Sequence, residues 1–226
     1  MFIGHFAVSF AAKKAAPRVS LGTMILSASF IDLLWPLFLV LGWEHVRVSP
    51  GITTVTPLDF YYYPITHSLA GVLGWSLLLG GIYWLLRRDF KSALIVGLGV
   101  LSHWVLDFLT HRPDLPLVPG IDFTVGLGLW NSLPGTIAVE GSLFLAGIYW
   151  YTKATTARNR TGSLSFWGLV IFLVIIYLSN LFGPPPPDGD ILGYVGLAMW
   201  LFVPWGYWID KNRITKAAEP ESPTPS

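Results

Sequence analysis

The feature that most constrains this fold is a series of apolar segments, each long enough to cross a lipid bilayer. A helix rises ~1.5 Å per residue and the hydrocarbon core is ~30 Å thick, so about 20 apolar residues make one span. The sequence is 53% hydrophobic and only 12% charged, which is too apolar for a soluble domain of this length. We therefore expect an all-α, polytopic integral membrane protein with about six transmembrane helices, at residues 20–43, 67–86, 92–110, 126–151, 164–182 and 191–208.

The N-terminus carries a shorter apolar run, residues 2–12, which is followed by Lys13 and Lys14. A signal peptide has its positive charge before a longer apolar core, so we expect a retained short helix. With the lysines at the cytoplasmic surface, this helix lifts His5 by roughly 12 Å, close to the middle of the hydrocarbon core. A half-spanning helix is one interpretation, and an interfacial helix with a solvated His5 is the other.

Basic residues predict how the spans are oriented, because cytoplasmic connections are enriched in lysine and arginine. The intervening connections hold only Arg47 and Arg112. We therefore expect both termini in the cytoplasm, and His67 and residues 103–111 in the outer half of the membrane. The basic clusters that share the cytoplasmic side are Lys13, Lys14 and Arg18; Arg87, Arg88 and Lys91; Lys153, Arg158 and Arg160; and Lys211, Arg213 and Lys216.

Two acidic side chains lie inside predicted spans. Asp32 falls well inside the first span, and Glu140 lies near the middle of the fourth. An unpaired charge at such a depth costs several kcal/mol, so intramembrane carboxylates mark candidate functional sites. For Asp32 and for Glu140, structural pairing and a proton relay are the alternatives to a role in catalysis.

Residues 102–111 hold three side chains that can bind metal. His103, Asp107 and His111 recur at intervals of four, which places them on one face of a helix. His103 and Asp107 can reach one cation at the ~2.0–2.2 Å distances that zinc takes with nitrogen and oxygen. His111 lies ~12 Å from His103 along the axis, so Asp107 would bridge two ions if both histidines bind metal. His67 is a candidate third ligand, which would leave a position for water.

The cysteine count and the net charge limit which ligands and partners the site can have. Cysteine is absent, so a metal must be held by His, Asp or Glu, and the net charge of +1 gives no indication of a nucleic-acid partner. Intramembrane histidines can also do no more than hydrogen-bond between helices. Four of the five histidines lie in or beside apolar segments, and three share a leaflet with Asp107, which favours a metal site over structural polar packing. The fifth, His45, is expected to be solvated beside Glu44.

The order of these residues resembles a known family. The likeness covers residues 1–140 and is to the bacterial membrane-bound metal-dependent hydrolases of the YdjM type, which are in turn similar to zinc-dependent phospholipase C and the S1/P1 nucleases. It implies an all-helical metal site in a bacterial inner (cytoplasmic) membrane. The motifs that carry the resemblance are Gly4-His5, Ile31-Asp32, Thr66-His67-Ser68, the run of residues 102–107 and Thr110-His111.

The resemblance also implies roles for individual residues. His103 and Asp107 would bind metal from one helix, with Asp107 able to bridge two ions. His67 would complete the coordination of one ion and His5 would serve a second. Asp32 matches the acidic residue suited to activating water.

A third ion would fall to His111 and Glu140. In the phospholipase-like pattern, a histidine stands four residues before the late glutamate, whereas Thr136 occupies that position here. Because threonine does not replace imidazole as a zinc ligand, the sequence predicts one or two divalent ions, with zinc as the expected metal.

These observations predict a membrane-embedded, metal-dependent hydrolase that cleaves a phosphoester or another ester of a lipid or lipid-linked substrate from the outer leaflet. Asp32 and Glu140 are the acidic side chains available for catalysis. The alternatives are a proton-coupled transporter, in which the buried acidic residues and histidines form a relay, and a non-catalytic membrane adaptor. We expect one helical domain over residues 1–216 and a disordered polar tail over residues 217–226, while the sequence leaves the oligomeric state open.

Overall fold

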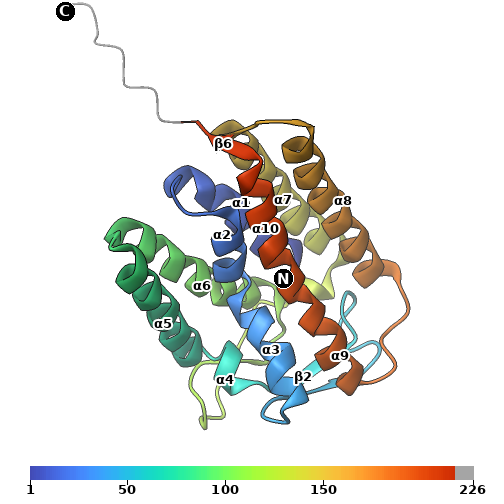
Figure 1. Ribbon diagram of the computed structural model, residues 1–226. Coiled ribbons are helices and arrows are strands. Elements are labelled where there is room, and N and C mark those ends of the chain that lie inside the picture. The colour runs from blue at the N-terminus through green and yellow to red at the C-terminus, as the bar shows by residue number, and fades with distance from the viewer. Residues whose placement is uncertain (217–226) are drawn as a thin grey trace, which may run out of the picture.

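The computed structural model describes residues 1–216 and is mostly helical (Figure 1). The predicted polar tail, residues 217–226, lies outside the described residues. The helices are α1 (Ile3–Ala15), α2 (Leu21–Ala28), α3 (Phe30–Val40), α4 (Pro64–His67), α5 (Leu69–Arg87), α6 (Phe90–Thr110), η1 (Leu129–Asn131), α7 (Leu133–Ala154), α8 (Arg160–Phe182), α9 (Gly189–Gly196), η2 (Leu197–Leu201) and α10 (Phe202–Lys211).

Short polar side chains begin six of these helices. Each accepts a hydrogen bond from a backbone N–H two or three residues further on, which satisfies a donor that has no partner within its own helix. These caps determine where each helix begins, and so where the side chains of its first turns lie. The capping residues are Ser20 for α2, Ser68 for α5, Asp89 for α6, Ser132 for α7, Asn159 for α8 and Asp188 for α9.

The N-terminal helix α1 lies inside the bundle rather than on the membrane surface. It packs against α7, α2 and α6, and Phe6 and Phe10 belong to the largest apolar core (Figure 1). Gly147 of α7 permits this close approach, because a Cβ there would lie 2.6 Å from the carbonyl oxygen of Ala7. His5 is only 1% exposed, so the alternative of an interfacial helix with a solvated His5 is wrong.

Four helical segments of the described chain are long and apolar enough to span a bilayer: α5, α6, α8 and the run Gly189–Lys211, which joins α9, η2 and α10. The pair α2 and α3 makes a fifth if it is counted as one span, although it bends by 57°. Helix α7, which covers the predicted fourth span, is not among these segments, because glycine, threonine and Glu140 dilute its apolar content. Four to five candidate spans therefore stand, and the prediction of six is not confirmed.

The predicted helical fold class is confirmed as mostly helical, and the connections between the helices add short strands. Antiparallel pairs form between β1 (His45–Val48) and β2 (Leu58–Tyr62), between β3 (Leu115–Pro116) and β4 (Thr124–Val125), and between β5 (Thr155–Ala157) and β6 (Arg213–Thr215). Valine, threonine and aromatic residues in these connections suit extended backbone. The longest pair, β1–β2, forms a hairpin beside α3 and α9 at one end of the bundle (Figure 1).

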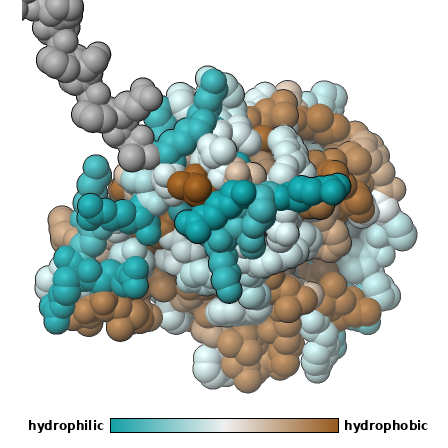
Figure 2. All heavy atoms as spheres, turned by 45° about the horizontal axis from the view of Figure 1, so that its top comes forward, coloured by the Kyte–Doolittle hydropathy of each residue, from teal (hydrophilic) through white to brown (hydrophobic). Residues whose placement is uncertain are grey.

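The ends of the helices that carry the basic clusters gather at the opposite end. Strand β6 pairs with β5, and the Thr215 hydroxyl donates to the Pro17 carbonyl, which brings the C-terminal strand beside the turn after α1. Hydrophilic side chains cover this end, with apolar side chains on its flanks (Figure 2). The arrangement agrees with the predicted topology, but the orientation in the membrane stays a prediction.

Candidate metal centre

Five polar side chains from four segments of the chain meet inside the bundle. His5 comes from α1, Asp32 from the first turn of α3, His67 from the end of α4, and His103 and Asp107 from successive turns of α6. The three histidines and Asp107 are at most 4% exposed, whereas the Asp32 side chain is 24% exposed. Five of the seven predicted site residues are thus brought together.

Asp107 faces the edges of two stacked imidazoles. The rings of His5 and His103 stack with their centroids 3.7 Å apart and their planes 5° from parallel. Nε2 of His5 lies 3.2 Å from Oδ1 of Asp107, and Nε2 of His103 lies 3.1 Å from Oδ2. The carboxylate therefore faces one nitrogen of each ring.

Asp32 and His67 complete the group from the other side. Oδ1 of Asp32 lies 3.5 Å from Nε2 of His103 and 3.8 Å from Nε2 of His67. The ligand atoms fall into two triads, each within 4.8 Å, namely His5, His103 and Asp107, and Asp32, His67 and His103. His103 belongs to both triads, and a single lone pair on its Nε2 serves only one ion.

The donor set fits a divalent cation. Two ligands bound tetrahedrally at ~2.1 Å lie ~3.4 Å apart, and the nitrogen-to-carboxylate separations of 3.1–3.9 Å include this value. Within the described chain, Nε2 of His5 and Nε2 of His103 are buried without a hydrogen bond. Buried polar atoms without a partner are costly, and a cation between them and the carboxylates would satisfy them.

Hydrogen bonds on the far side of two rings fix which nitrogen faces the cluster. Nδ1 of His103 donates to the carbonyl of Ala28 at 3.1 Å, since a carbonyl only accepts. Nδ1 of His67 lies 2.7 Å from the Thr66 hydroxyl. Such partners orient metal-binding histidines and raise their basicity.

Glu44 is a contributor that sequence reasoning missed. The Thr66 hydroxyl donates to Oε2 of Glu44 at 2.6 Å, so it must accept the hydrogen bond from His67. Oε1 of Glu44 accepts the backbone N–H groups of Ile65 and Thr66, both at 2.7 Å. Glu44 is fully buried, although it follows the predicted span in what reads as a polar loop. Its sequence position gives no signal of this role.

Glu140 approaches the cluster but belongs to neither triad. Its Oε2 accepts the backbone N–H of Phe2 at 3.1 Å, beside the first turn of α1. A carboxylate at a helix N-terminus is favourable, because unpaired N–H groups and the helix dipole face it. Glu140 therefore holds the start of the helix that carries His5. The amino group of Met1 lies 2.5 Å from Oδ1 of Asp107, which places a positive charge against the same carboxylate.

His111 is also outside the triads. Its Nδ1 lies 3.0 Å from Oδ1 of Asp114 and 3.2 Å from the hydroxyl of Tyr63. Burial, and then the charge of Asp114, raises the pKa of Tyr63 well above its usual range, so this phenol stays protonated and donates to Asp114. Thr136 donates its hydroxyl to the Leu129 carbonyl at 3.0 Å. The structure thus does not bring together the ligands that a third ion of the phospholipase-like pattern would need.

The cluster lies against a cavity of about 780 Å³. Asp32, His67 and Asp107 contribute to its wall, together with His111 and Glu140. Asp32 combines a place in the cluster with the greatest exposure of the five side chains. A molecule in the cavity can therefore reach the carboxylates directly.

These features define a class: a mostly helical membrane protein with a buried cluster of histidine and aspartate side chains that could hold a metal ion. The chain matches the family described as YdjM inner membrane protein over residues 2–183, and it belongs to that family. The resemblance drawn from the motifs is confirmed at this level. No match was found among the curated proteins or the solved structures.

Proposed function

We propose that this protein is a metal-dependent hydrolase that cleaves an ester bond. The observation that carries the proposal is the cluster itself, in which three imidazole nitrogens and two carboxylates converge at the wall of a cavity. Nε2 of His5 and Nε2 of His103 make no hydrogen bond within the described chain, yet both lie within 3.2 Å of the Asp107 carboxylate, and a bound cation would engage all three groups at once.

In this proposal, His5, His67, His103 and Asp107 hold the metal, and zinc is the expected ion. Because His103 is common to both triads, a single ion would draw its ligands from both. Two ions would require Asp107 or Asp32 to bridge them. A bound divalent cation polarises an ester or phosphoryl oxygen and lowers the pKa of a nearby water molecule.

Asp32 is the proposed proton acceptor. It is the most exposed carboxylate of the cluster, so it can hydrogen-bond a water molecule in the cavity. Asp107 contacts one nitrogen of each of two imidazoles and suits a ligand better than a base. Glu140 holds the N-terminus of α1, which makes it a positioning residue in this scheme.

We further propose that the substrate is a phosphoester of a lipid or lipid-linked molecule in the outer leaflet. In a site that contains little water, one or two cations would stabilise the negative charge that develops on the phosphoryl oxygens during the reaction. The basic ends of α1, α5 and α10 put the cluster on the outer side if they face the cytoplasm. The predicted likeness to zinc-dependent phospholipase C agrees with this substrate.

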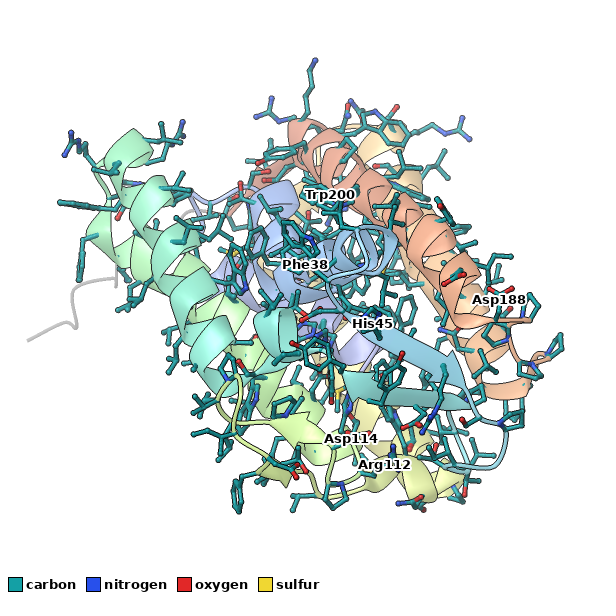
Figure 3. All side chains as sticks on the ribbon, turned by 90° about the horizontal axis from the view of Figure 1, so that it is seen from below. Phe38, His45, Arg112, Asp114, Asp188 and Trp200 are labelled. Atoms are coloured by element: carbon teal, nitrogen blue, oxygen red, sulfur yellow. The ribbon has the colours of Figure 1, made fainter. Side chains whose placement is uncertain are left out.

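Metal analysis and a hydrolysis screen test the proposal. We expect stoichiometric zinc or a similar ion in the purified protein, and its loss in His103→Ala and Asp107→Ala. We also expect phospholipid hydrolysis that depends on Asp32 and is abolished in Asp32→Asn. His45→Ala is the matched control, because that imidazole is exposed on the hairpin (Figure 3).

Two results would contradict the proposal. Metal occupancy that is absent, or unchanged in His103→Ala, would remove the metal site. Proton-coupled uptake in proteoliposomes, lost in Glu140→Gln while metal content stays the same, would favour a transporter instead.

A further inference from the structure

The cavity beside the metal centre extends into a cleft between α8 and the segment α9–η2–α10. One wall comes from the second half of α8, including Ile176 and Ser179. The opposite wall comes from Val195, Ala198 and Met199. The cleft is part of the same cavity that reaches Asp32 and Asp107, so its contents lie next to the site.

The two walls diverge because each packs on a different partner. Towards its N-terminus, α8 is held to α10, where the indole N–H of Trp205 donates to the Ser165 carbonyl at 3.1 Å. Further along, α9 turns away to pack on α3, and a Cβ at Gly193 would lie 3.0 Å from Val40. The helices therefore splay apart as they approach the end that carries the β1–β2 hairpin (Figure 1).

The cleft is apolar and open at the side of the protein. Val195 and Leu201 line the cavity although they are 65% and 68% exposed. Side chains that are both lining and exposed mark the opening of the cavity. Phe172 lines it from α8 and is 43% exposed. Both walls belong to candidate membrane spans, so an opening between them would face lipid once these segments cross a bilayer.

The length of the cleft matches one leaflet. From Phe172 to the end of α8 at Phe182 is ten residues, or ~15 Å of helix, which is half of a ~30 Å hydrocarbon core. At the far end, α9 begins beside the hairpin that carries His45, since a Cβ at Gly189 would clash with the Val46 carbonyl oxygen, and Asp188 caps the helix there (Figure 3). The cleft thus runs from the polar connections of this end to the depth of mid-span.

We propose that this cleft is a subsite for the hydrocarbon chain of a membrane lipid, which enters sideways between α8 and α9–η2–α10. The proposal rests on the proposed function, because it places the lipid's ester at the metal centre while the chain lies in the cleft. A lipid hydrocarbon chain that moves from the bilayer into this apolar cleft stays in apolar surroundings, so the transfer costs little free energy. Drawing it through water would weaken binding roughly fourfold for each methylene exposed.

Photolabelling of the purified full chain in detergent tests the subsite directly. The probe is a phosphatidylethanolamine with a diazirine in its acyl chain, and mass spectrometry locates the label. We expect saturable labelling of Ile176 and Met199, and competition by unlabelled long-chain phospholipid but not by a short-chain soluble ester. Labelling that does not saturate, or that a short-chain ester displaces equally well, would overturn the proposal.

Two variants fill the cleft from opposite walls, Ala198→Trp and Ser179→Trp. Each should reduce labelling of Met199 by about fivefold or more, because the added ring occupies the space of the chain. Ile175→Trp is the control, since Ile175 is 55% exposed and does not line the cavity. Equal labelling in all three variants would refute the subsite, and the competition experiment decides the matter if neither filled variant folds.

The two proposals can fail separately. Labelling that persists in His103→Ala or after chelation supports the chain subsite whether or not the protein hydrolyses esters. Hydrolysis of a short-chain ester without saturable labelling would retain the hydrolase and overturn the subsite alone.

Discussion

Replacing Thr66 by valine tests whether a buried chain of hydrogen bonds positions a metal ligand. The Thr66 hydroxyl connects Nδ1 of His67 to Oε2 of Glu44 through contacts of 2.7 and 2.6 Å. Valine has nearly the same shape but can neither accept from the imidazole nor donate to the carboxylate. In Thr66→Val, the ring of His67 is free to rotate away from Asp32.

The expected loss of metal affinity depends on which hydrogen-bonding groups the substitution leaves without a partner. Glu44 keeps its two backbone donors, so most of its charge remains compensated. The buried Nδ1–H of His67 loses its partner, at a cost of about 1–3 kcal/mol. If this cost destabilises the ring orientation of His67 that binds metal, the metal affinity drops by roughly 10- to 100-fold. Substitutions of residues that support metal-binding histidines typically have effects of this size.

Competition with a chromophoric chelator measures the affinity. Thr66→Ser keeps the hydroxyl and should remain within about threefold of the parent protein. Thr152→Val is the matched control, because the Thr152 hydroxyl donates only to the carbonyls of Ile148 and Tyr149 within its own helix. A Thr66→Val variant with the metal affinity of the parent would refute the idea that this chain positions His67.

Three further predictions concern other parts of the molecule. His103→Ala should lose bound metal while His111→Ala retains it in elemental analysis; loss from both would place His111 among the ligands. Asp59→Asn removes a buried carboxylate that bridges two partly exposed arginines, so we expect a loss of about 1–2 kcal/mol, or roughly 2–8 °C in Tm. An unchanged Tm would contradict this. Hydrogen bonds from the hydroxyl and the backbone N–H of Ser92 lower the pKa of Asp89, so this cap stabilises the protein above the unfolded-state pKa of ~4 and its contribution is lost as the pH falls through the folded-state value. Asp89→Asn should flatten the acid side of the curve of Tm against pH, and a curve of unchanged slope would argue against it.

Local spacing was enough to predict which side chains of α6 share a face. His103 and Asp107 are one turn apart, and both are buried on the side that faces α1 and α3. The cost of an intramembrane charge likewise singled out Asp32, which lies in the cluster. His5 was expected away from the polar surface because of its distance from the lysines that follow it, and it is buried, while its depth in the membrane stays a prediction. These inferences work because helix geometry and bilayer thickness act on short stretches of sequence.

What the sequence did not predict depends on contacts between distant segments. In the sequence, Glu44 has the pattern of an exposed loop residue. Its burial depends on the contact with Thr66 of α4, which no local sequence pattern predicts. His111 fits the helical spacing, but α6 ends at Thr110 and His111 turns to Asp114. Glu140 could not be assigned, because its partner is the backbone at the start of α1.

Breaks in the helices supply what an unbroken bundle could not. Within an α-helix, the carbonyls are used by N–H groups four residues further on. At the bend between α2 and α3, the carbonyl of Ala28 is instead available to Nδ1 of His103, and Asp32 follows in the next turn. At the break after α4, Ser68 is extended and His67 precedes it. Non-helical backbone at membrane depth is tolerated only where protein or a cavity satisfies it. The bends therefore belong to the site, because they provide the polar groups that orient its histidines.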